Sequence, residues 1–251
     1  MTLALPARAK LNLDLVVTGR RPDGMHELRT RMQAIELHDV LEIEPASKTS
    51  LTVTGFELSS GQPNSVLTAH GLVEAAAGRK LPASFTLHKR IPPGSGLGGA
   101  SSDAATVLRA LTAMYSLDVD LQRLARQVGS DVPFFLRGGA ALVEGAGERV
   151  TAIPVQGSWF AIAWPGVVLS TGDVYKAYDG VGGDGPNQLR RAAGQVSPEL
   201  EDFASKLGDG WQMTGSGSAF FRACDDHESA MVAVRELSCW TAVTPAVGAW
   251  A

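Results

Sequence analysis

The sequence has little cysteine and no long hydrophobic run. Cys224 and Cys239 are the only cysteines, which is too few for a disulfide framework, and their spacing is not that of a zinc site. No run of about eighteen apolar residues occurs, and the N-terminal segment MTLALPARAKLN lacks the apolar core of a signal peptide. We therefore expect a cytoplasmic protein that folds without disulfides or structural metals.

An excess of positive charge is also lacking. The chain of 251 residues carries 22 lysines and arginines against 26 aspartates and glutamates, for a net charge of -4. This balance offers no broad attraction for nucleic acid or anionic lipid, so neither is an expected partner. The expected partner is a small molecule, and the expected assembly is a monomer or a weak homodimer. The hydrophobic fraction of 45% is sufficient for one large core or two smaller ones.

Two hydrophobic periodicities occur along the chain. Alternating and short apolar runs predict strands over residues 7–17, 32–37, 40–43, 84–91 and 140–150. Helical spacing predicts helices over residues 64–77, 104–114 and 121–128. A turn-like segment near residues 153–158 then precedes a new apolar run. We therefore expect an α+β protein with two domains, residues 1–155 and residues 156–251.

The segment IPPGSGLGGASSDAA, which begins at Ile91, carries the clearest chemical signal. Its four glycines let the backbone approach a ligand closely, and the helix that follows offers unpaired N–H groups and a partial positive charge. Such a loop suits a phosphate group. Ser101 and Ser102 either add hydroxyl donors or cap the helix, and the two roles are equally compatible with the sequence.

Three alternative roles fit the glycine loop less well. A simple chain reversal needs only one or two special backbone conformations, fewer than this segment provides. The dinucleotide motif G-x-G-x-x-G occurs from Gly94 to Gly99, but the predicted helix leaves no room for a second strand that ends at an acidic residue. The G-x-x-x-x-G-K motif of P-loop proteins is excluded because no lysine follows the glycines.

Residues 92–105 resemble the phosphate loop of the GHMP family of small-molecule kinases, P-x-x-x-G-L-G-S-S-A-A. Three further blocks occur in the family's order: ARAKLNLDLVVTGRRPDGMHEL, GSDVPFFLRGGAALVEGAGE and MTGSGSAFF. The similarity covers most of the chain, with residues 181–210 the least informative part. It implies an N-terminal domain like domain 2 of ribosomal protein S5 and a ferredoxin-like C-terminal domain.

The resemblance also implies an ATP-dependent transfer. Together the blocks are similar to those of members that phosphorylate the 2-hydroxyl of a cytidine diphosphate alcohol in non-mevalonate isoprenoid synthesis. ATP is then the co-substrate, and Mg²⁺ accompanies it because the ion neutralises the β- and γ-phosphate oxygens. No protein ligand for the metal stands out. The nearest alternative is another GHMP kinase, acting on mevalonate, homoserine or a sugar; a silent nucleotide-binding module and an RNA-binding relative are more distant alternatives.

The resemblance assigns catalysis to Asp131 and Lys10. Asp131 would accept the proton of the substrate hydroxyl, although an aspartate just before Val132 and Pro133 also suits a helix N-cap. Lys10 would stabilise the negative charge that develops during transfer, although a strand lysine is also common on a solvated surface. For Asp131 the residues alone leave the choice open, and for Lys10 they favour the solvated strand position. The resemblance favours catalysis for both.

Substrate binding is implied for two groups of residues. Asn12 and His26 fall on family positions that contact the substrate, with the His26 segment at the cytosine end. Met25 stands where the family usually has an aromatic ring; its sulfur is polarizable but it lacks a π face. Tyr175 resembles an aromatic residue that closes over the base, or it merely packs its helix. Thr171 contacts substrate or caps that helix.

A glycine-rich turn and the nucleotide contacts complete the implied set. Gly215, Ser216, Gly217 and Ser218 form a turn whose N–H groups would face the substrate's phosphates or the transferring group. Asn64 stands at a family position near the nucleotide base, although an asparagine after a proline is also a natural helix cap. The other implied ATP-binding residues are those of the glycine loop: Pro92, Pro93, Gly94, Ser95, Gly96, Leu97, Gly98, Gly99, Ala100, Ser101 and Ser102.

Overall fold

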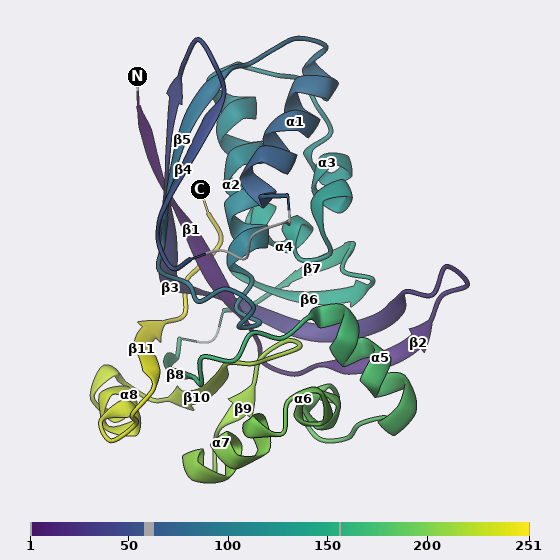
Figure 1. Cartoon of the computed structure of the whole chain (residues 1–251), viewed down its shortest axis with the longest axis vertical. Coiled ribbons are helices and arrows are strands. Elements are labelled where there is room, and N and C mark those ends of the chain that lie inside the picture. The colour runs from purple at the N-terminus through teal and green to yellow at the C-terminus, as the bar shows by residue number, and fades with distance from the viewer. Residues whose placement is uncertain (1, 58–62, 156, 251) are drawn as a thin grey trace. The chain divides into compact units, whose positions relative to one another are not determined.

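The computed structural model describes residues 2–57, 63–155 and 157–250, drawn in colour in Figure 1. The chain divides into two compact units. The first comprises Met1–Ala9, Leu37–Pro93 and Gly98–Arg137, and the second comprises Lys10–Glu36, Gly94–Leu97 and Gly138–Ala251. The domain boundary expected between residues 155 and 156 involves residue 156, which lies outside the described residues, and it stays a prediction.

The first unit combines a sheet with four helices. Strand β4 (Ser50–Gly55) runs parallel to β5 (Ala83–Lys89), and β5 pairs antiparallel with residues 40–45 of β3 (His26–Pro45). Strand β1 (Leu3–Asn12) also pairs with β3. The helices are α1 (Ser65–Ala77), α2 (Gly99–Met114), α3 (Leu121–Val128) and α4 (Val132–Arg137). Figure 1 shows α1 and α2 on one face of β4 and β5. The helices expected over residues 64–77, 104–114 and 121–128 are confirmed as α1, α2 and α3.

Side-chain caps define where two of these helices begin. The Asn64 side chain accepts a hydrogen bond from the N–H of Val66 at 2.9 Å and starts α1, and the Asp120 side chain accepts one from Arg123 at 2.9 Å and starts α3. Each such cap stabilises a helix by about 1 kcal/mol. Gly78 ends α1 with a φ angle of 65°, in the left-handed region that glycine adopts without strain.

The second unit contains further strands of the seven-stranded sheet that includes β3, and a separate four-stranded sheet. In one, residues 28–33 of β3 pair antiparallel with β6 (Ala140–Gly145), which pairs with β7 (Arg149–Ile153), while β2 (Val16–Arg20) pairs with the start of β3. The other is antiparallel with the order β11-β8-β10-β9. Its strands are β8 (Trp159–Trp164), β9 (Gln212–Met213), β10 (Phe220–Cys224) and β11 (Trp240–Pro245). The unit's helices are α5 (Thr171–Val181), α6 (Arg190–Val196), α7 (Glu199–Leu207) and α8 (His227–Val234).

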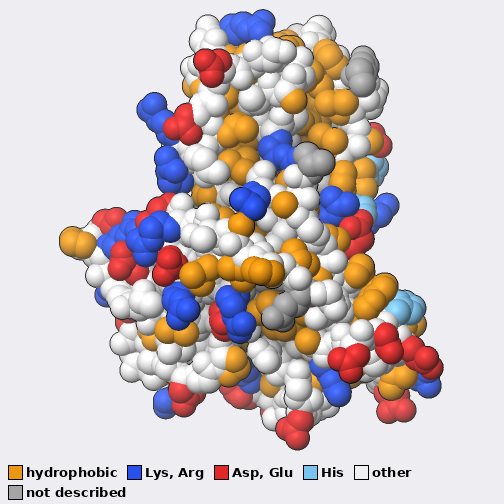
Figure 2. All heavy atoms as spheres, turned by 180° about the vertical axis from the view of Figure 1, so that it is seen from behind, with side chains coloured by type: hydrophobic (Ala, Val, Ile, Leu, Met, Phe, Trp, Pro, Cys, Tyr) orange, Lys and Arg blue, Asp and Glu red, His pale blue; other side chains and the backbone are white. Residues whose placement is uncertain are grey.

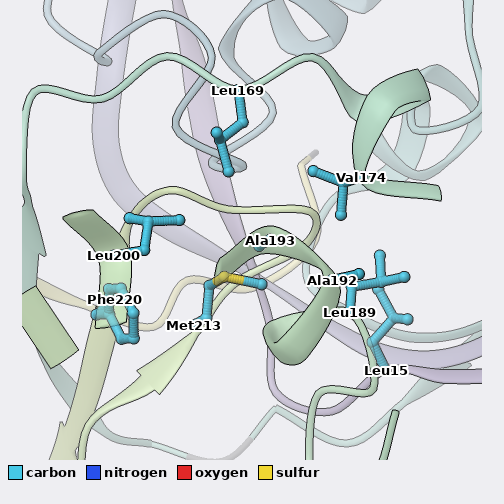
Figure 3. Packing of buried hydrophobic residues seen from close by; sticks show 9 residues of the cluster. All are labelled: Leu15, Leu169, Val174, Leu189, Ala192, Ala193, Leu200, Met213 and Phe220. Atoms are coloured by element: carbon cyan, nitrogen blue, oxygen red, sulfur yellow. The ribbon is translucent and has the colours of Figure 1, made fainter. Parts of the chain in front are cut away.

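A hydrophobic core holds the helices α5, α6 and α7 together with β9 and β10 (Figure 3). Every member is at most 8% exposed, and burial of each large apolar side chain contributes about 1.5–3 kcal/mol. Leu169 lies just before α5, and Met213 lies just before the glycine-rich turn at residues 214–218. The core therefore fixes both segments that carry predicted substrate-binding residues. Its members are Leu15, Leu169, Val174, Leu189, Ala192, Ala193, Leu200, Met213 and Phe220.

The continuous strand expected over residues 7–17 is wrong in the middle. Strand β1 ends at Asn12 and β2 begins at Val16. Between them the Asp14 carboxylate accepts hydrogen bonds from the N–H of Arg31 at 2.7 Å and from Nε of Arg31 at 2.6 Å. These side-chain bonds replace strand pairing at Asp14, because a short acidic side chain competes with the backbone for local N–H groups.

Two other strand predictions have wrong boundaries. The separate strands expected over residues 32–37 and 40–43 are parts of one strand, β3, which runs from His26 to Pro45. The single strand expected over residues 140–150 is a hairpin of β6 and β7. Gly145 and Gly147, with φ angles of 72° and 104°, form the turn between them. Glycines of this kind end a strand that apolar alternation alone would continue.

The surface in Figure 2 carries Lys and Arg side chains interspersed with Asp and Glu. This pattern agrees with the small net charge of -4. Over the described part of this face, the Lys and Arg side chains do not gather into one large area. Of the helices that the structure describes, none has the length and apolar composition to cross a lipid bilayer.

Candidate active site

The glycine loop has a backbone conformation that favours glycine. Gly94, Gly96 and Gly98 have φ angles of 62°, 79° and 77°. A Cβ atom on Gly96 would lie 2.4 Å from the carbonyl oxygen of Thr214, and one on Gly94 would lie 2.5 Å from Cγ1 of Val168. Both distances are too short for a side chain, so glycine is needed here for backbone angle and for space.

Helix α2 begins directly after this loop at Gly99. Its N-cap residue is Gly98, which provides no side-chain hydrogen bond. Ser101 and Ser102 lie within the first turn, so the alternative that either serine caps the helix is wrong. The N–H of Ser102 donates to the carbonyl of Gly98 at 2.9 Å. The first turn of α2 therefore offers N–H groups and a partial positive charge without a capping side chain, which suits an anion.

Lys10 lies against the middle of the glycine loop within the second unit. Its ammonium donates hydrogen bonds to Oδ1 of Asn12 and to the carbonyl of Gly96. Its backbone N–H donates to the carbonyl of Leu97 at 3.0 Å. The residue is only 2% exposed, so the alternative of a solvated surface lysine is wrong. A buried lysine is costly unless polar groups surround it, and here they hold the charge in one place.

Asn12 joins Lys10 to the glycine-rich turn at residues 214–218. Its backbone N–H donates to Oγ1 of Thr214 at 2.9 Å, and its Nδ2 donates to Oγ1 of Thr30 at 2.9 Å. A Cβ atom on Gly215 would lie 3.1 Å from Nζ of Lys10 and 3.2 Å from Oδ1 of Asn12. Three segments far apart in the sequence thus meet, and Asn12, only 3% exposed, is not an ordinary surface residue.

The glycine-rich turn is held by residues that the sequence did not single out. Asn187, which is 4% exposed, donates from Nδ2 to the carbonyls of Met213 at 2.7 Å and Gly215 at 2.9 Å. At the other end, Nε1 of Trp164 donates to Oγ of Ser218 at 2.9 Å. Asn187 lies in a segment with the composition of a surface turn, and only its burial identifies it.

Thr171 and Ser216 face each other across the second unit's site. Their hydroxyl oxygens are 3.0 Å apart. The N-cap of α5 is Ser170, whose side chain accepts from the N–H of Asp173 at 3.3 Å, so the alternative that Thr171 caps this helix is wrong. The cap lies one residue earlier than the sequence suggests, because either hydroxyl suits that position.

An aromatic and charged group surrounds His26. The ring of Tyr175 stacks on that of His26 with centroids 4.8 Å apart and an interplanar angle of 24°. Nε2 of His26 is 2.6 Å from Oδ1 of Asp179, and Nη1 of Arg20 is 3.3 Å from Oδ2 of Asp179. The hydrogen bond with His26, and then the neighbouring positive charges, lower the pKa of Asp179. Asp179 follows Tyr175 by one helical turn of α5, a spacing that could have identified it.

Met25, the residue before His26, lies at the tip of the β2–β3 hairpin. Its side chain is 50% exposed. The N–H of Met25 donates to the Asp23 carboxylate at 3.0 Å, within the turn between the two strands. The position is accessible to a ligand, and the thioether is the group it presents.

The first unit carries the other predicted nucleotide and catalytic residues. Asn64 caps α1, so this expected structural role is confirmed. Asp131 is half-buried and directly precedes α4, and its carbonyl accepts from the N–H of Phe135 at 3.4 Å. Asp131 therefore lies where α4 begins, which is compatible with both of its predicted roles.

A buried group of charges in the first unit lies beside the glycine loop and was missed. Lys89 ends β5, and its ammonium donates to Asp39 of β3 and to Oδ2 of Asp103 in α2, the latter at 2.9 Å. The three residues are at most 5% exposed. A signal was present in the sequence: Ala83, Phe85, Leu87 and Lys89 share one face of β5, so alternation places the lysine on the buried side.

The two-unit α+β fold, with a glycine loop that enters a long helix and a buried strand lysine that contacts this loop, defines a small-molecule kinase of the GHMP class. The model of the GHMP kinases N terminal domain matches residues 64–139. A relative from Pelotomaculum thermopropionicum, named 4-diphosphocytidyl-2-C-methyl-D-erythritol kinase, is 39% identical over 92% of each chain. A relative of the same name from Thermus thermophilus is 38% identical over 93% of this chain and 92% of its own. The chain belongs to the 4-diphosphocytidyl-2-C-methyl-D-erythritol kinase family.

Solved structures agree with this assignment. The crystal structure of a 4-(cytidine 5'-diphospho)-2C-methyl-D-erythritol kinase has a TM-score of 0.82 at 35% identity, covering 98% of this chain and 100% of the other. A mevalonate kinase has a TM-score of 0.67 at 13% identity, covering 98% and 99%, and shares the fold alone. The predicted GHMP kinase fold and the predicted family are confirmed.

Proposed function

We propose that this chain transfers the γ-phosphoryl group of ATP to the 2-hydroxyl of 4-diphosphocytidyl-2-C-methyl-D-erythritol. The products are the 2-phosphate of that substrate and ADP. The observation that carries the proposal is the buried ammonium of Lys10, hydrogen-bonded to the carbonyl of Gly96 in the glycine loop. The substrate is suggested by the names of the relatives from Pelotomaculum and Thermus.

In the proposed step, the substrate oxygen forms a bond to the γ-phosphorus while the bond from that phosphorus to the β,γ-bridging oxygen breaks. ADP leaves with the bonding electron pair, and Asp131 takes the proton of the hydroxyl. Negative charge spreads over the transferring group, and the Lys10 ammonium stabilises it. Because Asn12 and Gly96 already hold that ammonium, little reorganisation is needed during the transfer.

The glycine loop is the proposed seat of the ATP phosphates. Its backbone N–H groups and the first turn of α2 supply hydrogen bonds and partial positive charge, with the hydroxyls of Ser101 and Ser102 as further donors. Asn64 is proposed to lie near the base. Within the described residues, no group of three or more His, Cys, Asp or Glu side chains is arranged to hold a metal. Mg²⁺ is proposed to enter with ATP, because the ion neutralises the β- and γ-phosphate oxygens.

The cytosine ring of the substrate is proposed to bind beside His26 and Tyr175. The two protein rings lie nearly parallel, which provides a flat apolar surface and a polar ring edge. Met25, the residue before His26 in the sequence, is exposed, and its polarizable sulfur is proposed to lie against the base. Recognition of cytosine in this chain thus combines one aromatic ring from α5 with a thioether from the β2–β3 hairpin.

The remaining polar groups of the second unit are proposed to bind the rest of the substrate. Amide, hydroxyl and N–H groups that suit a diphosphate and an alcohol are carried by Asn12, Thr171 and the turn Gly215, Ser216, Gly217 and Ser218.

We place the reaction in the cytoplasm, where ATP is supplied. Both cysteines are free, which is compatible with a reducing compartment. The proposed assembly remains a monomer or a weak homodimer.

The proposal is tested by measuring ADP release with ATP, Mg²⁺ and a panel of acceptors. The panel contains the cytidyl substrate, mevalonate, homoserine and a hexose. We expect turnover with the cytidyl substrate alone, and loss of that turnover in Lys10→Met. Turnover with another member of the panel would instead support a different GHMP kinase activity, and ATP binding without turnover on any acceptor would support the silent nucleotide-binding module.

A further inference from the structure

The buried charges beside the glycine loop exceed what the fold needs. Asp39, Lys89 and Asp103 are 0%, 5% and 2% exposed. A buried ion pair stabilises a fold little or not at all compared with apolar residues of the same size, because the charges lose their water. Oδ1 of Asp103 is also buried and has no hydrogen-bond partner among the described residues. Three buried ionisable groups at one place therefore need a reason other than packing.

The hydrogen bonds of these charges reach both ends of the loop. On the incoming side, Oδ1 of Asp39 accepts from the backbone N–H of Arg90 at 2.6 Å and of Ile91 at 2.8 Å, the two residues just before Pro92. On the outgoing side, the Lys89 ammonium donates to Oδ2 of Asp103, one turn into α2, at 2.9 Å. The same ammonium donates to Oδ2 of Asp39.

The lysine also lies against the first residue of α2. A Cβ atom on Gly99 would be 3.1 Å from Nζ of Lys89. Burial is the largest single influence on the pKa of Lys89, and it lowers that pKa. The Asp103 and Asp39 carboxylates together outweigh burial and raise the pKa of Lys89, so the ammonium stays charged. Charge-assisted hydrogen bonds are about twice as strong as neutral ones, which makes this a stiff connection between the two ends.

We propose that Asp39, Lys89 and Asp103 form a clasp that holds the two ends of the glycine loop in the geometry that binds the ATP phosphates. Lys89 is thereby a positioning residue for the nucleotide. The proposal rests on the proposed kinase function, since it assigns the clasp to the phosphate site of that reaction. A loop that reaches its binding geometry for only a fraction of the time binds its ligand more weakly by that fraction, so loss of the clasp raises the ATP requirement.

The test compares Lys89→Met/Asp103→Asn with Asp103→Asn alone. The double variant keeps the Asp39 carboxylate with its two backbone N–H partners but removes the connection to α2, and it leaves fewer unpaired charges than Lys89→Met would. We expect its Kd for a non-hydrolysable ATP analogue and its KM for ATP to exceed those of Asp103→Asn by about tenfold. The KM for the cytidyl substrate is expected to change less than twofold.

Val73→Ala is the matched control for lost stability. Val73 is fully buried on α1 and lies outside the proposed site, so this variant lowers the melting temperature without touching the clasp. Its KM for ATP is expected to stay unchanged. A double variant with a lowered melting temperature but the nucleotide Kd of Asp103→Asn would overturn the clasp and leave a structural ion group only. Nucleotide Kd is measured without turnover, so absence of kinase activity in the wild type would refute the proposed function separately.

Hydrogen exchange on the wild-type protein provides a second test that needs no variant. The N–H groups of Arg90 and Ile91 are expected to be strongly protected without nucleotide, because Asp39 already holds them. Exchange of both as fast as in an exposed loop, with protection only after an ATP analogue is added, would show that no preformed clasp exists.

Discussion

Replacing Asp103 by asparagine is expected to stabilise the protein, and to do so more strongly at higher pH. Burial is the main cause that raises the pKa of Asp103 from 3.8 to about 7; Lys89 opposes this rise and the negative charge of Asp39 adds to it. In the folded protein the Asp103 carboxyl group is therefore neutral well below pH 7 and loses its proton only around pH 7. Asparagine has the same shape as that neutral form and cannot ionise.

The sign and size of the effect follow from proton binding. Between about pH 4 and 7 the folded protein holds the Asp103 proton while the unfolded chain has released it, so the free energy of unfolding falls as pH rises through this window and levels off above it. At about 1.4 kcal/mol for each pH unit, the loss between pH 5 and 7 is at most about 3 kcal/mol. The stability advantage of Asp103→Asn over the wild type is expected to grow by up to that amount from pH 5 to pH 8.

The assay is urea unfolding of both proteins at pH 5 and pH 8, followed by tryptophan fluorescence. Asp118→Asn is the matched control, because Asp118 is exposed near the end of the same helix and should alter stability little and equally at both pH values. The reasoning would be refuted if the difference between Asp103→Asn and wild type were the same at both pH values, or if the variant were less stable at pH 8. Either result would mean that the ionised carboxylate is well solvated or fully paired.

Three further predictions concern activity. Asp131→Asn is expected to lower kcat by about two to four powers of ten with little change in nucleotide Kd, since a general base is lost; near-normal kcat would remove Asp131 from the proposed step. Gly96→Ala is expected to raise the KM for ATP at least about tenfold, because the φ angle of 79° and the 2.4 Å approach to Thr214 exclude a Cβ atom; an unchanged KM would mean that this backbone does not bind phosphate. Asp179→Ala is expected to raise the KM for the cytidyl substrate several-fold by releasing His26, while the KM for ATP stays constant; equal effects on both would argue against a cytosine-side role.

The sequence predicts local structure well where one side chain decides it. Asn64 marks the start of α1 because its side chain accepts a hydrogen bond from a free N–H group of the first turn. The sequence-based prediction fails where a residue far away in the sequence determines the local structure. The break after Asn12 depends on Asp14 binding Arg31, which only the folded hairpin brings together.

For the site, the motifs identify the residues that face a ligand but not those that support them. Lys10 and the glycine loop are found from the family pattern, and the structure adds that the two are in contact. Asn187 and Asp39 were not found, because each acts through backbone groups far away in the sequence and belongs to no motif. Lys89 could have been found from the alternation along β5, since a lysine on a buried face needs a partner.

The most direct test of the central claim is the structure of the product. Purified wild-type protein is incubated with ATP, Mg²⁺ and 4-diphosphocytidyl-2-C-methyl-D-erythritol, and the product is analysed by ³¹P and ¹³C NMR. We predict one new phosphate monoester, with ³¹P–¹³C coupling to the tertiary carbon that bears the 2-hydroxyl, formed in equal amount to ADP. Recovery of unchanged substrate, or a phosphate on another oxygen, would contradict the proposed reaction.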